Sequence, residues 1–263
     1  MNRLDKELVE RNLVETRTKA QELISSGAVV VNGKVQNKAS FSVDVADEIK
    51  ITDMEVLKYV SRGGFKLEKA LEVFNINLKD KVVLDIGSST GGFTDCALQH
   101  GAKKVIAVDV GTDVMHKSLR KNPQVELHEN TNIVQLEHEK FVDVDLIVVD
   151  VSFVSLERVV KKVNDENVKV EMMCLIKPQF ECGKEIATKY GGVIKSKTVH
   201  KDVLNKVIKF FNKNNFYLLG LDFSPIKGGD GNIEYISLFT NKTSDNVKIE
   251  TEKIVNVAFG QNK

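Results

Sequence analysis

The pattern of apolar and polar positions changes at Lys81. Beyond this residue, short runs rich in Val, Ile and Leu alternate with longer stretches that have helical, amphipathic spacing. Continuous apolar runs are typical of the strands of a parallel sheet, because helices cover both faces of such a sheet. The pattern predicts an α/β domain over residues 65–263. Its first four strands are expected in KVVLDIG, KVIAVDV, VDLIVVDV and VEMMCLIKP.

The last two apolar runs, FYLLGLDF and NIEYISLFT, are joined only by SPIKGGDG. A connection this short cannot contain a crossover helix, so we expect the two strands to pair antiparallel. A mostly parallel sheet with an antiparallel last strand resembles the Rossmann-like fold of class I methyltransferases. Topology alone is a weak indicator of function, so this similarity predicts a fold class only.

The N-terminal residues have a different, mixed pattern. RLDKELVERNL shows near-helical spacing of leucines, and Thr16 can cap a second helix that Gly27 would end. A hairpin turn is predicted at Asn32-Gly33, and another short strand over residues 45–51, where Val45, Ile49 and Ile51 are apolar. Two helices and a hairpin predict a small α+β domain at residues 1–52.

A linker is expected between the two domains, at residues 53–64. Its last two residues, Gly63 and Gly64, can break the chain direction before the helical segment FKLEKALEVFN. At the other end of the chain, IETEKIVNVAF predicts a short helix that packs against the large domain. The apolar positions of this helix are Ile249, Ile254, Val257 and Phe259.

Composition restricts the classes of partner. The chain has 263 residues and a formal net charge of +1, so attraction to a polyanion would have to come from local patches. No apolar run approaches the roughly 20 residues that span a bilayer, and the first residues lack a signal-peptide core. The three cysteines form no CxxC pair, which suits a reducing compartment. We expect a cytoplasmic protein that does not associate with membranes.

A glycine-rich turn follows the first strand of the large domain, in DIGSSTGGF. Glycines let the backbone approach a ligand, and Asp109, at the end of the second strand, can accept hydrogen bonds from ribose hydroxyls. The turn is not G-x-G-x-x-G, which favours a nucleoside cofactor without a pyrophosphate, such as S-adenosylmethionine. The candidate cofactor-binding residues are Asp85, Gly87, Gly91, Gly92, Phe93 and Asp109.

The same turn also contains G-x-S-x-G, the nucleophile elbow of hydrolases. Ser89, Asp150 and His200 occur in the order of a hydrolase triad. His200, however, falls in a predicted helix instead of a loop after the last strand, and Asp109 would have no role. The sequence therefore favours the cofactor site over the triad.

Charged residues are expected at the ligand-binding edge of the sheet. Asp150 and Lys177 each end an apolar strand, and such positions face the crevice at the carboxyl ends of parallel strands. Lys66, just before the large domain, and Glu234, entering the last strand, also lie in apolar or glycine-rich surroundings. Four charges of mixed sign at one edge predict a catalytic cluster.

These residues lie in motifs that closely resemble the TlyA-type (hemolysin A) family, FtsJ-like ribose 2′-O-methyltransferases with an S-four-type RNA-binding domain in front. The resemblance covers residues 2–240 and implies that the family's Lys-Asp-Lys-Glu tetrad is Lys66, Asp150, Lys177 and Glu234. The motifs that carry it, in order, are SRGGFKLEKAL, LDIGSSTGGFTD, VDVG, VVDVSFVSL, LIKPQFECGK, GGV and GNIEY.

The tetrad suits methylation of an alcohol. A ribose hydroxyl becomes a good nucleophile only as its proton is removed, and a neutral amine within hydrogen-bond reach can do this. Lys177 is our candidate for that base. Asp150 would favour its charged form, whereas burial and the nearby Lys66 would favour the neutral form. The alternative is that Lys177 only orients the hydroxyl, with Lys66 and Glu234 positioning the nucleotide.

The N-terminal module resembles the S-four-type domain, in which basic side chains of the second helix and nearby loop bind the RNA backbone. Such contacts determine affinity and register, not sequence. The candidates here are Arg3, Arg11, Arg17, Lys19 and Lys34.

The resemblance implies a cytidine of ribosomal RNA as the substrate, within ribosomal subunits. The early start at Met1 favours the members that act on the large subunit alone. We expect a monomer and no metal site. The main alternative is a non-catalytic RNA-binding or ribosome-assembly factor that retains the fold, although an intact tetrad argues against it. Membrane lysis, which the family label suggests, has no apolar span or strongly amphipathic basic segment to support it.

Overall fold

The structure is a computed structural model that describes residues 1–152, 155–242 and 247–260. Phe153 and Val154, within the VVDVSFVSL motif, lie outside the described residues. The chain divides into two compact units, Met1–Arg62 and Gly63–Lys263. Within the described residues, no helix is long and apolar enough to cross a membrane.

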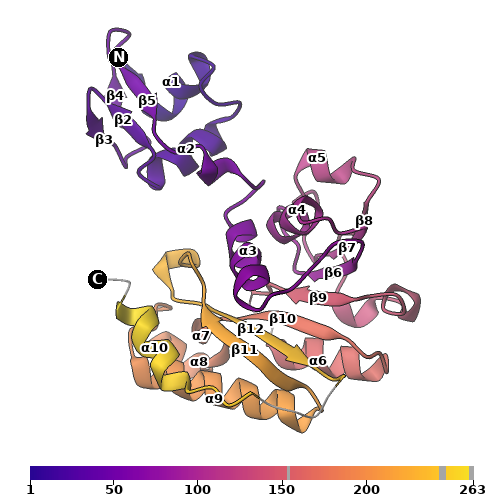
Figure 1. Cartoon of the computed structure of the whole chain (residues 1–263). Helices are drawn as coiled ribbons and strands as arrows, with labels where there is room; N and C mark the ends of the chain where they lie inside the picture. Colours follow the sequence, from indigo (N-terminus) through magenta and orange to yellow (C-terminus); the bar gives the residue numbers. More distant parts are fainter. Residues whose placement is uncertain (153–154, 243–246, 261–263) are drawn as a thin grey trace. The chain divides into compact units, whose positions relative to one another are not determined.

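The first unit is a small α+β fold, drawn in indigo and violet in Figure 1. Thr16 caps the second helix by accepting a hydrogen bond from the backbone N–H of Lys19, as predicted. Asn32 and Gly33 both have positive φ and form the predicted hairpin turn. Its elements are β1 (Asn2–Arg3), α1 (Leu4–Glu10), α2 (Arg17–Ser25), β2 (Val29–Val31), β3 (Lys34–Val35), β4 (Ser42–Val43), β5 (Ile49–Ile51) and the 3-10 helix η1 (Glu55–Leu57).

Two details of this unit differ from the prediction. Val45 is 86% exposed and lies outside β5, because the turn over Asp44–Asp47 precedes the strand. The pairing of β1 with β4 was not predicted, since two-residue strands carry no readable periodicity. The core of the unit joins both helices to β2, through leucines such as Leu4, Leu8 and Leu23.

The second unit is built on one seven-stranded sheet with the order β11-β12-β10-β9-β6-β7-β8. β6, β7, β8, β9 and β10 run parallel to one another, and β12 lies antiparallel between β10 and β11. The predicted fold class and the antiparallel pairing are confirmed. The strands are β6 (Val82–Ile86), β7 (Lys104–Val108), β8 (Val125–His128), β9 (Leu146–Val149), β10 (Glu171–Ile176), β11 (Tyr217–Phe223) and β12 (Tyr235–Thr240).

Helices cover both faces of this sheet, and α9 and α10 pack together on the face opposite α3 and α4 (Figure 1). The helices are α3 (Gly63–Val73), α4 (Gly92–Gln99), α5 (Lys117–Arg120), α6 (Leu156–Asp165), α7 (Pro178–Glu181), α8 (Lys184–Lys189), α9 (Lys197–Lys213) and α10 (Thr251–Gly260). The 3-10 helices are η2 (Ile133–Gln135), η3 (His138–Lys140) and η4 (Gly229–Gly231).

Three predictions for this unit need correction. Gly63 and Gly64 do not break the chain, because α3 begins at Gly63. β8 was not predicted, since VELH is short and polar at alternate positions. In α10, Val257 is 49% exposed, and Val255 and Ala258 form the buried face instead. Ile249, Ile254 and Phe259 do pack against the core, as predicted.

Candidate active site

The turn between β6 and α4 brings two strand ends together. Gly87 and Gly91 have φ values of 84° and 96°, in the left-handed region that favours glycine. A Cβ on Gly87 would lie 2.6 Å from the backbone oxygen of Asp150, so only glycine allows the end of β9 to approach this closely. The turn therefore fixes the position of Asp150 relative to the first strand.

A cavity of about 290 Å³ lies beside this turn. Of the predicted cofactor-binding residues, Gly87 and Asp109 are in its lining. Both oxygens of Asp109 accept backbone hydrogen bonds, from the N–H of Ser89 at 2.8 Å and of Gly111 at 2.7 Å. The sequence did not predict the remaining lining residues as a set. They are Ile86, Ser89, Val108, Val110, Thr131, Asn132, Ile133, Asp150, Val151, Ser152 and Val159.

The other predicted cofactor-binding residues lie in or behind the glycine turn and are not part of the cavity lining. Gly91 faces Leu119 and Met115, and Phe93 is buried in α4. Asp85 is fully buried, and its Oδ2 accepts a hydrogen bond from Thr94 Oγ1 at 2.6 Å. Among the described residues, neither Asp85, Gly91, Gly92 nor Phe93 lines the cavity. The motif identifies the glycine-rich turn, but it does not show which residues of the turn face the ligand. The prediction therefore included residues that do not line the cavity.

Asp85 carries an unusual charge environment. Burial raises its pKa to about 7, and the negative charges of Asp150 and Asp109 act in the same direction, while the hydrogen bond from Thr94 opposes them. Its Oδ1 and the hydroxyl of Ser88 are buried without a hydrogen-bond partner among the described residues. Neither residue lines the cavity, so these unsatisfied atoms lie behind the glycine turn.

Asp85 should make stability depend on pH. Because its folded pKa of about 7 exceeds its unfolded value, the folded state binds more protons between roughly pH 4 and pH 7. The free energy of unfolding should therefore fall as pH rises through this window and level off above it. Urea unfolding of Asp85→Asn should show a weaker decline from pH 5 to pH 8, with the exposed Asp165→Asn as the control. Equal declines in all three proteins would contradict this assignment.

A second cavity, of about 800 Å³, adjoins the predicted catalytic residues. Lys66, Lys177 and Glu234 line it, and Asp150 lines the first cavity. Ser152 belongs to the linings of both. The other lining residues of the second cavity are Gln179, Phe180, Gly183, Lys184, Ala187, Gly192, Gly229, Asp230 and Asn232.

The four predicted catalytic residues meet in one ion-pair network. Lys177 Nζ lies 2.5 Å from Asp150 Oδ1, and Lys66 Nζ lies 3.6 Å from Asp150 Oδ2. Lys66 Nζ also donates a hydrogen bond of 2.7 Å to Glu234 Oε2. The side chains are between 3% and 20% exposed, so water screens these charges only weakly. Asp150 therefore links the two lysines, and Glu234 holds the second of them.

The two lysines have different surroundings. Burial lowers the pKa of Lys66, but the carboxylates of Asp150 and Glu234 outweigh this effect and hold the pKa above its ordinary value. Lys66 is thus a permanent cation that can position a negative group. Among the described residues, Lys177 pairs with one carboxylate, Asp150, and donates a hydrogen bond of 3.0 Å to the neutral hydroxyl of Ser152.

Neighbouring residues hold Glu234 in place. Gln179 Nε2 donates a hydrogen bond of 3.3 Å to Glu234 Oε1, and a Cβ on Gly228 would lie 2.0 Å from that same oxygen. Sequence reasoning did not select Gln179, Ser152 or Gly228. The only available signal for Gln179 and Ser152 was their place in the sequence. Gln179 follows the strand-end residue Lys177 by two positions, and Ser152 follows the strand-end residue Asp150 by two positions.

The hydrolase arrangement does not form. His200 is buried in α9 and contacts the hydroxyl of Tyr235 at 2.8 Å and the carbonyl of Ile194 at 3.0 Å. Ser89 and Asp150 line the first cavity, but His200 lines neither cavity described above. A base for Ser89 is therefore missing from the place that a triad requires.

The basic residues predicted to bind RNA do not form one cluster. Arg3 and Arg17 both pair with the buried Asp5, at 2.9 Å and 2.8 Å, and their side chains are 46% and 50% exposed. The Arg3 guanidinium, with help from Arg17 and Gln21, holds the pKa of Asp5 well below its usual range. Asp5 thus presents two guanidinium groups at the surface of the first unit.

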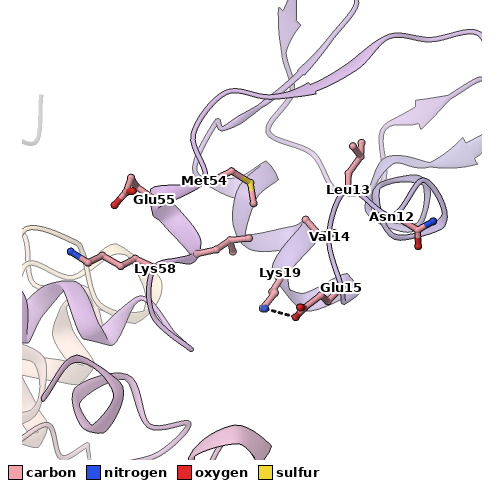
Figure 2. Close-up of a pocket in the computed structure, with 9 residues that line it drawn as sticks. Asn12, Leu13, Val14, Glu15, Lys19, Met54, Glu55 and Lys58 are labelled. Atoms are coloured by element: carbon pink, nitrogen blue, oxygen red, sulfur yellow. Dashed lines mark hydrogen bonds and ion pairs between the residues drawn. The ribbon is translucent and has the colours of Figure 1, made fainter. Parts of the chain in front are cut away.

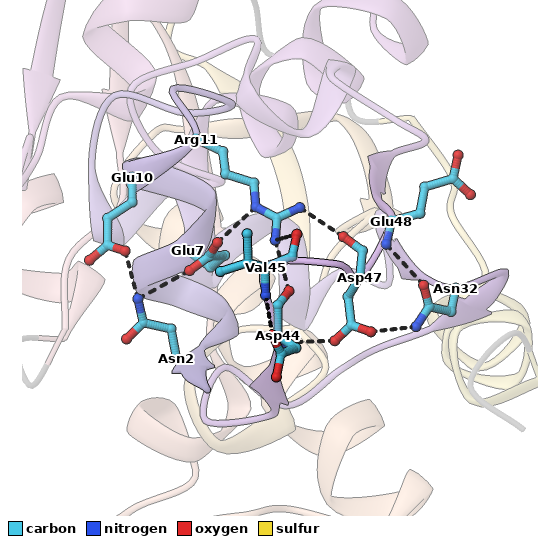
Figure 3. Close-up of polar contacts among 9 residues, drawn as sticks. All are labelled: Asn2, Glu7, Glu10, Arg11, Asn32, Asp44, Val45, Asp47 and Glu48. Carbon is cyan, nitrogen blue, oxygen red and sulfur yellow. Dashed lines mark hydrogen bonds and ion pairs between the residues drawn. The ribbon is translucent and has the colours of Figure 1, made fainter.

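Arg11 makes a separate set of contacts, which is drawn in Figure 3. It pairs with Glu7 at 2.8 Å and donates to the carbonyl oxygens of Asp44, Val45 and Asp47. These contacts join α1 to the turn before β5, so Arg11 stabilises the fold and is poorly placed to bind a ligand. Its assignment as an RNA-binding residue is not supported by this geometry.

The last two candidates lie apart from the Asp5 pair. Lys19 pairs with Glu15 at 2.6 Å, and both line a cavity of about 780 Å³ between the start of α2 and η1 (Figure 2). Lys34 is exposed in the hairpin strand β3. The structure brings together only Arg3 and Arg17 among the five predicted residues.

Comparisons with known proteins agree with this architecture. Residues 59–240 match the profile of the FtsJ-like methyltransferases, and residues 2–49 match the S4 domain. Hemolysin A of Brachyspira hyodysenteriae is 42% identical over 241 residues, which are 90% of this chain and 99% of that protein. The 23S rRNA (cytidine-2′-O)-methyltransferase TlyA of Campylobacter jejuni is 39% identical over 245 residues, 86% of this chain and 95% of that protein.

A solved structure shows the same two-part architecture. It is a Streptococcus thermophilus protein named as a hemolysin, with a TM-score of 0.77 and 38% identity over 99% of this chain and 97% of that one. Two of these relatives are thus named as hemolysins, and one is named as a methyltransferase. The matching profile spans both cavities and all four members of the ion-pair network. The chain belongs to the FtsJ-like methyltransferase family, in the group that contains TlyA and hemolysin A.

Proposed function

We propose that this protein transfers a methyl group from S-adenosylmethionine to the ribose 2′-hydroxyl of a cytidine in ribosomal RNA. The observation that carries the proposal is the network of Lys66, Asp150, Lys177 and Glu234, which lies where the two cavities adjoin. One cavity is adjacent to the glycine turn and suits a cofactor. The larger one is lined by polar and glycine residues and suits a nucleotide.

The first cavity fits S-adenosylmethionine by the chemistry of its lining. Asp109 would bind the ribose hydroxyls, and apolar residues such as Val110 and Ile133 would contact the adenine. When bound, the sulfonium supplies an activated methyl group, so the protein needs only to align a nucleophile and remove one proton.

The network then assigns roles on the RNA side. Lys177 is the group that would take the proton from the 2′-hydroxyl, because its Nζ borders the substrate cavity while being held by Asp150. Lys66, a permanent cation, would position the nucleotide, and Glu234 would hold Lys66. The phenyl ring of Phe180 lines the same cavity and offers a surface on which a base could stack.

The RNA itself would be captured by the S-four-type domain, residues 1–52, connected by residues 53–64 to the methyltransferase domain, residues 65–263. TlyA of Campylobacter jejuni is named for the 23S rRNA, which makes the large ribosomal subunit the first substrate to test. We propose that the protein acts on this substrate in the cytoplasm, as a monomer. The proposal is tested by incubating ribosomal subunits with labelled S-adenosylmethionine and mapping the modified nucleotide. Cofactor binding without any incorporation would favour a ribosome-assembly factor.

The two groups of arginines should behave differently. Arg17→Ala should weaken RNA binding and reduce the slope of log affinity against log salt by about one, since one phosphate contact is lost. Arg11→Ala should instead lower the free energy of unfolding by about 1–3 kcal/mol, because three carbonyl groups of the turn before β5 lose their charged donor. Filter binding at several salt concentrations and urea unfolding of both variants measure this. An unchanged affinity in Arg17→Ala, or a weakened affinity without destabilisation in Arg11→Ala, would reverse the assignment.

A further inference from the structure

Ser152 lies at the junction of the two cavities. It is exposed and lines both of them, whereas Asp150 lines only the first and Lys177 only the second. Its hydroxyl oxygen accepts a hydrogen bond of 3.0 Å from Lys177 Nζ. A methyl group that passes from cofactor to substrate must cross this junction, so Ser152 is next to the path of the reaction.

The backbone on both sides of Ser152 is anchored. Asp150 N donates to Ile86 O at 3.0 Å, next to the close approach at Gly87. After Ser152, the start of α6 is held by the buried carboxylate of Glu181. This carboxylate accepts hydrogen bonds from Ser155 Oγ at 3.1 Å and from Leu156 N at 3.0 Å. Asp150, two residues before Ser152, is therefore held in place, which suits a positioning role for Ser152.

The hydrogen bond from Lys177 to Ser152 affects the direction of the lone pair on the lysine nitrogen. Lys177 Nζ is tetrahedral, with one position bonded to Cε and three others available. One of these is directed at Ser152 Oγ in a hydrogen bond of 3.0 Å, whereas Asp150 Oδ1, at 2.5 Å, forms an ion pair without hydrogen-bond geometry. In the neutral amine the position directed at Ser152 carries an N–H group, and repulsion by the Asp150 carboxylate turns the lone pair to the position farther from Asp150. Without the Ser152 hydroxyl, none of the hydrogen bonds found among the described residues would fix the rotation of the amine about its Cε–Nζ bond, and the lone pair would have no fixed direction.

We propose that Ser152 is a positioning residue that directs the Lys177 lone pair into the substrate cavity, toward the ribose 2′-hydroxyl. The inference rests on the proposed function and adds a residue to its machinery. As the 2′-oxygen bonds to the methyl carbon, the carbon–sulfur bond breaks with its electron pair remaining on sulfur, and the hydroxyl proton passes to Lys177 Nζ. Ser152 exchanges no electrons or protons in this step.

The test compares Ser152→Ala with Ser152→Thr. Loss of the hydroxyl should lower kcat about 10- to 100-fold, because a misdirected base loses part of the gain from general-base catalysis. KM for RNA and the Kd for S-adenosylmethionine, measured by calorimetry, should be unchanged. Ser152→Thr retains the hydroxyl and should recover most of the rate. Thr198→Ala, which removes an exposed hydroxyl of α9 outside both cavities, is the control.

A second readout does not depend on activity. In protein with ¹⁵N-labelled lysine side chains, the Lys177 Nζ resonance can be identified by its absence in Lys177→Met. It should shift in Ser152→Ala and remain in place in Thr198→Ala. An unshifted resonance, an unchanged kcat, or a loss of cofactor affinity that accounts for the slower rate would overturn the proposal. If wild-type protein methylates no RNA while the resonance shifts, the contact is real and the proposed function is what fails.

Discussion

Replacing Lys177 with alanine is expected to lower the rate of methyl transfer by about three orders of magnitude, within the range that a general base contributes. The substitution removes the only amine that contacts both Asp150 and Ser152 among the described residues. Cofactor affinity should be retained, because Lys177 does not line the first cavity. Single-turnover transfer of a labelled methyl group to ribosomal subunits measures the chemical step, and calorimetry measures cofactor binding.

Lys177→Arg separates the two possible roles of this lysine. A guanidinium keeps the positive charge and can still orient a hydroxyl, but it cannot accept a proton at any accessible pH. If Lys177 is the base, the arginine variant should be as slow as the alanine variant. Lys184→Ala serves as the control, since Lys184 lines the same cavity without contacting the network, and it should change KM more than kcat. Substantial activity in Lys177→Arg would show that Lys177 only orients the hydroxyl.

Convergence of the tetrad could be predicted because sheet topology dictates it. Asp150 and Lys177 end parallel strands, and β9 and β10 are neighbours in the sheet, so their following residues must meet at one edge. Glu234 precedes β12, which runs antiparallel to β10, and its position at the same edge follows from the predicted hairpin. Lys66 lies on α3, and its predicted place in the network rested on its glycine-rich surroundings and on the family resemblance, since a helix position does not specify which strand it faces.

What could not be predicted depends on contacts between residues far apart in the sequence. Arg11 and Arg17 look equivalent as basic residues of one module, yet Arg11 is committed to carbonyl groups of the turn before β5. That turn has no sequence signal linking it to α1. In the same way, the glycine turn identified the cofactor site but not its lining. Asp85 falls behind the turn, while Thr131 and Asn132, from the loop after β8, complete the cavity.

Asp150→Asn is expected to lower kcat at least about 100-fold, although the substitution preserves the shape of the side chain. Asp150 contacts Lys177 at 2.5 Å and Lys66 at 3.6 Å, so loss of its charge affects both lysines at once. Lys66 keeps Glu234, but burial, which lowers its pKa, would then be opposed by one carboxylate instead of two. Among the described residues, Lys177 would then contact neutral partners alone, the new amide and the hydroxyl of Ser152.

A matched control exists in the same unit. Asp222 pairs with Lys69 at 3.0 Å, and its side chain is 24% exposed, against 20% for Asp150. Asp222→Asn removes an ion pair of similar burial that borders neither cavity described above, so it should change stability to a similar degree and leave kcat unaffected. Urea unfolding and single-turnover transfer, measured on both variants, separate the two effects. Equal losses of rate in the two variants would show that Asp150 contributes only through the stability of the fold. A loss confined to Asp150→Asn would show that its charge organises the two lysines for catalysis, because a purely structural ion pair has no reason to affect the chemical step.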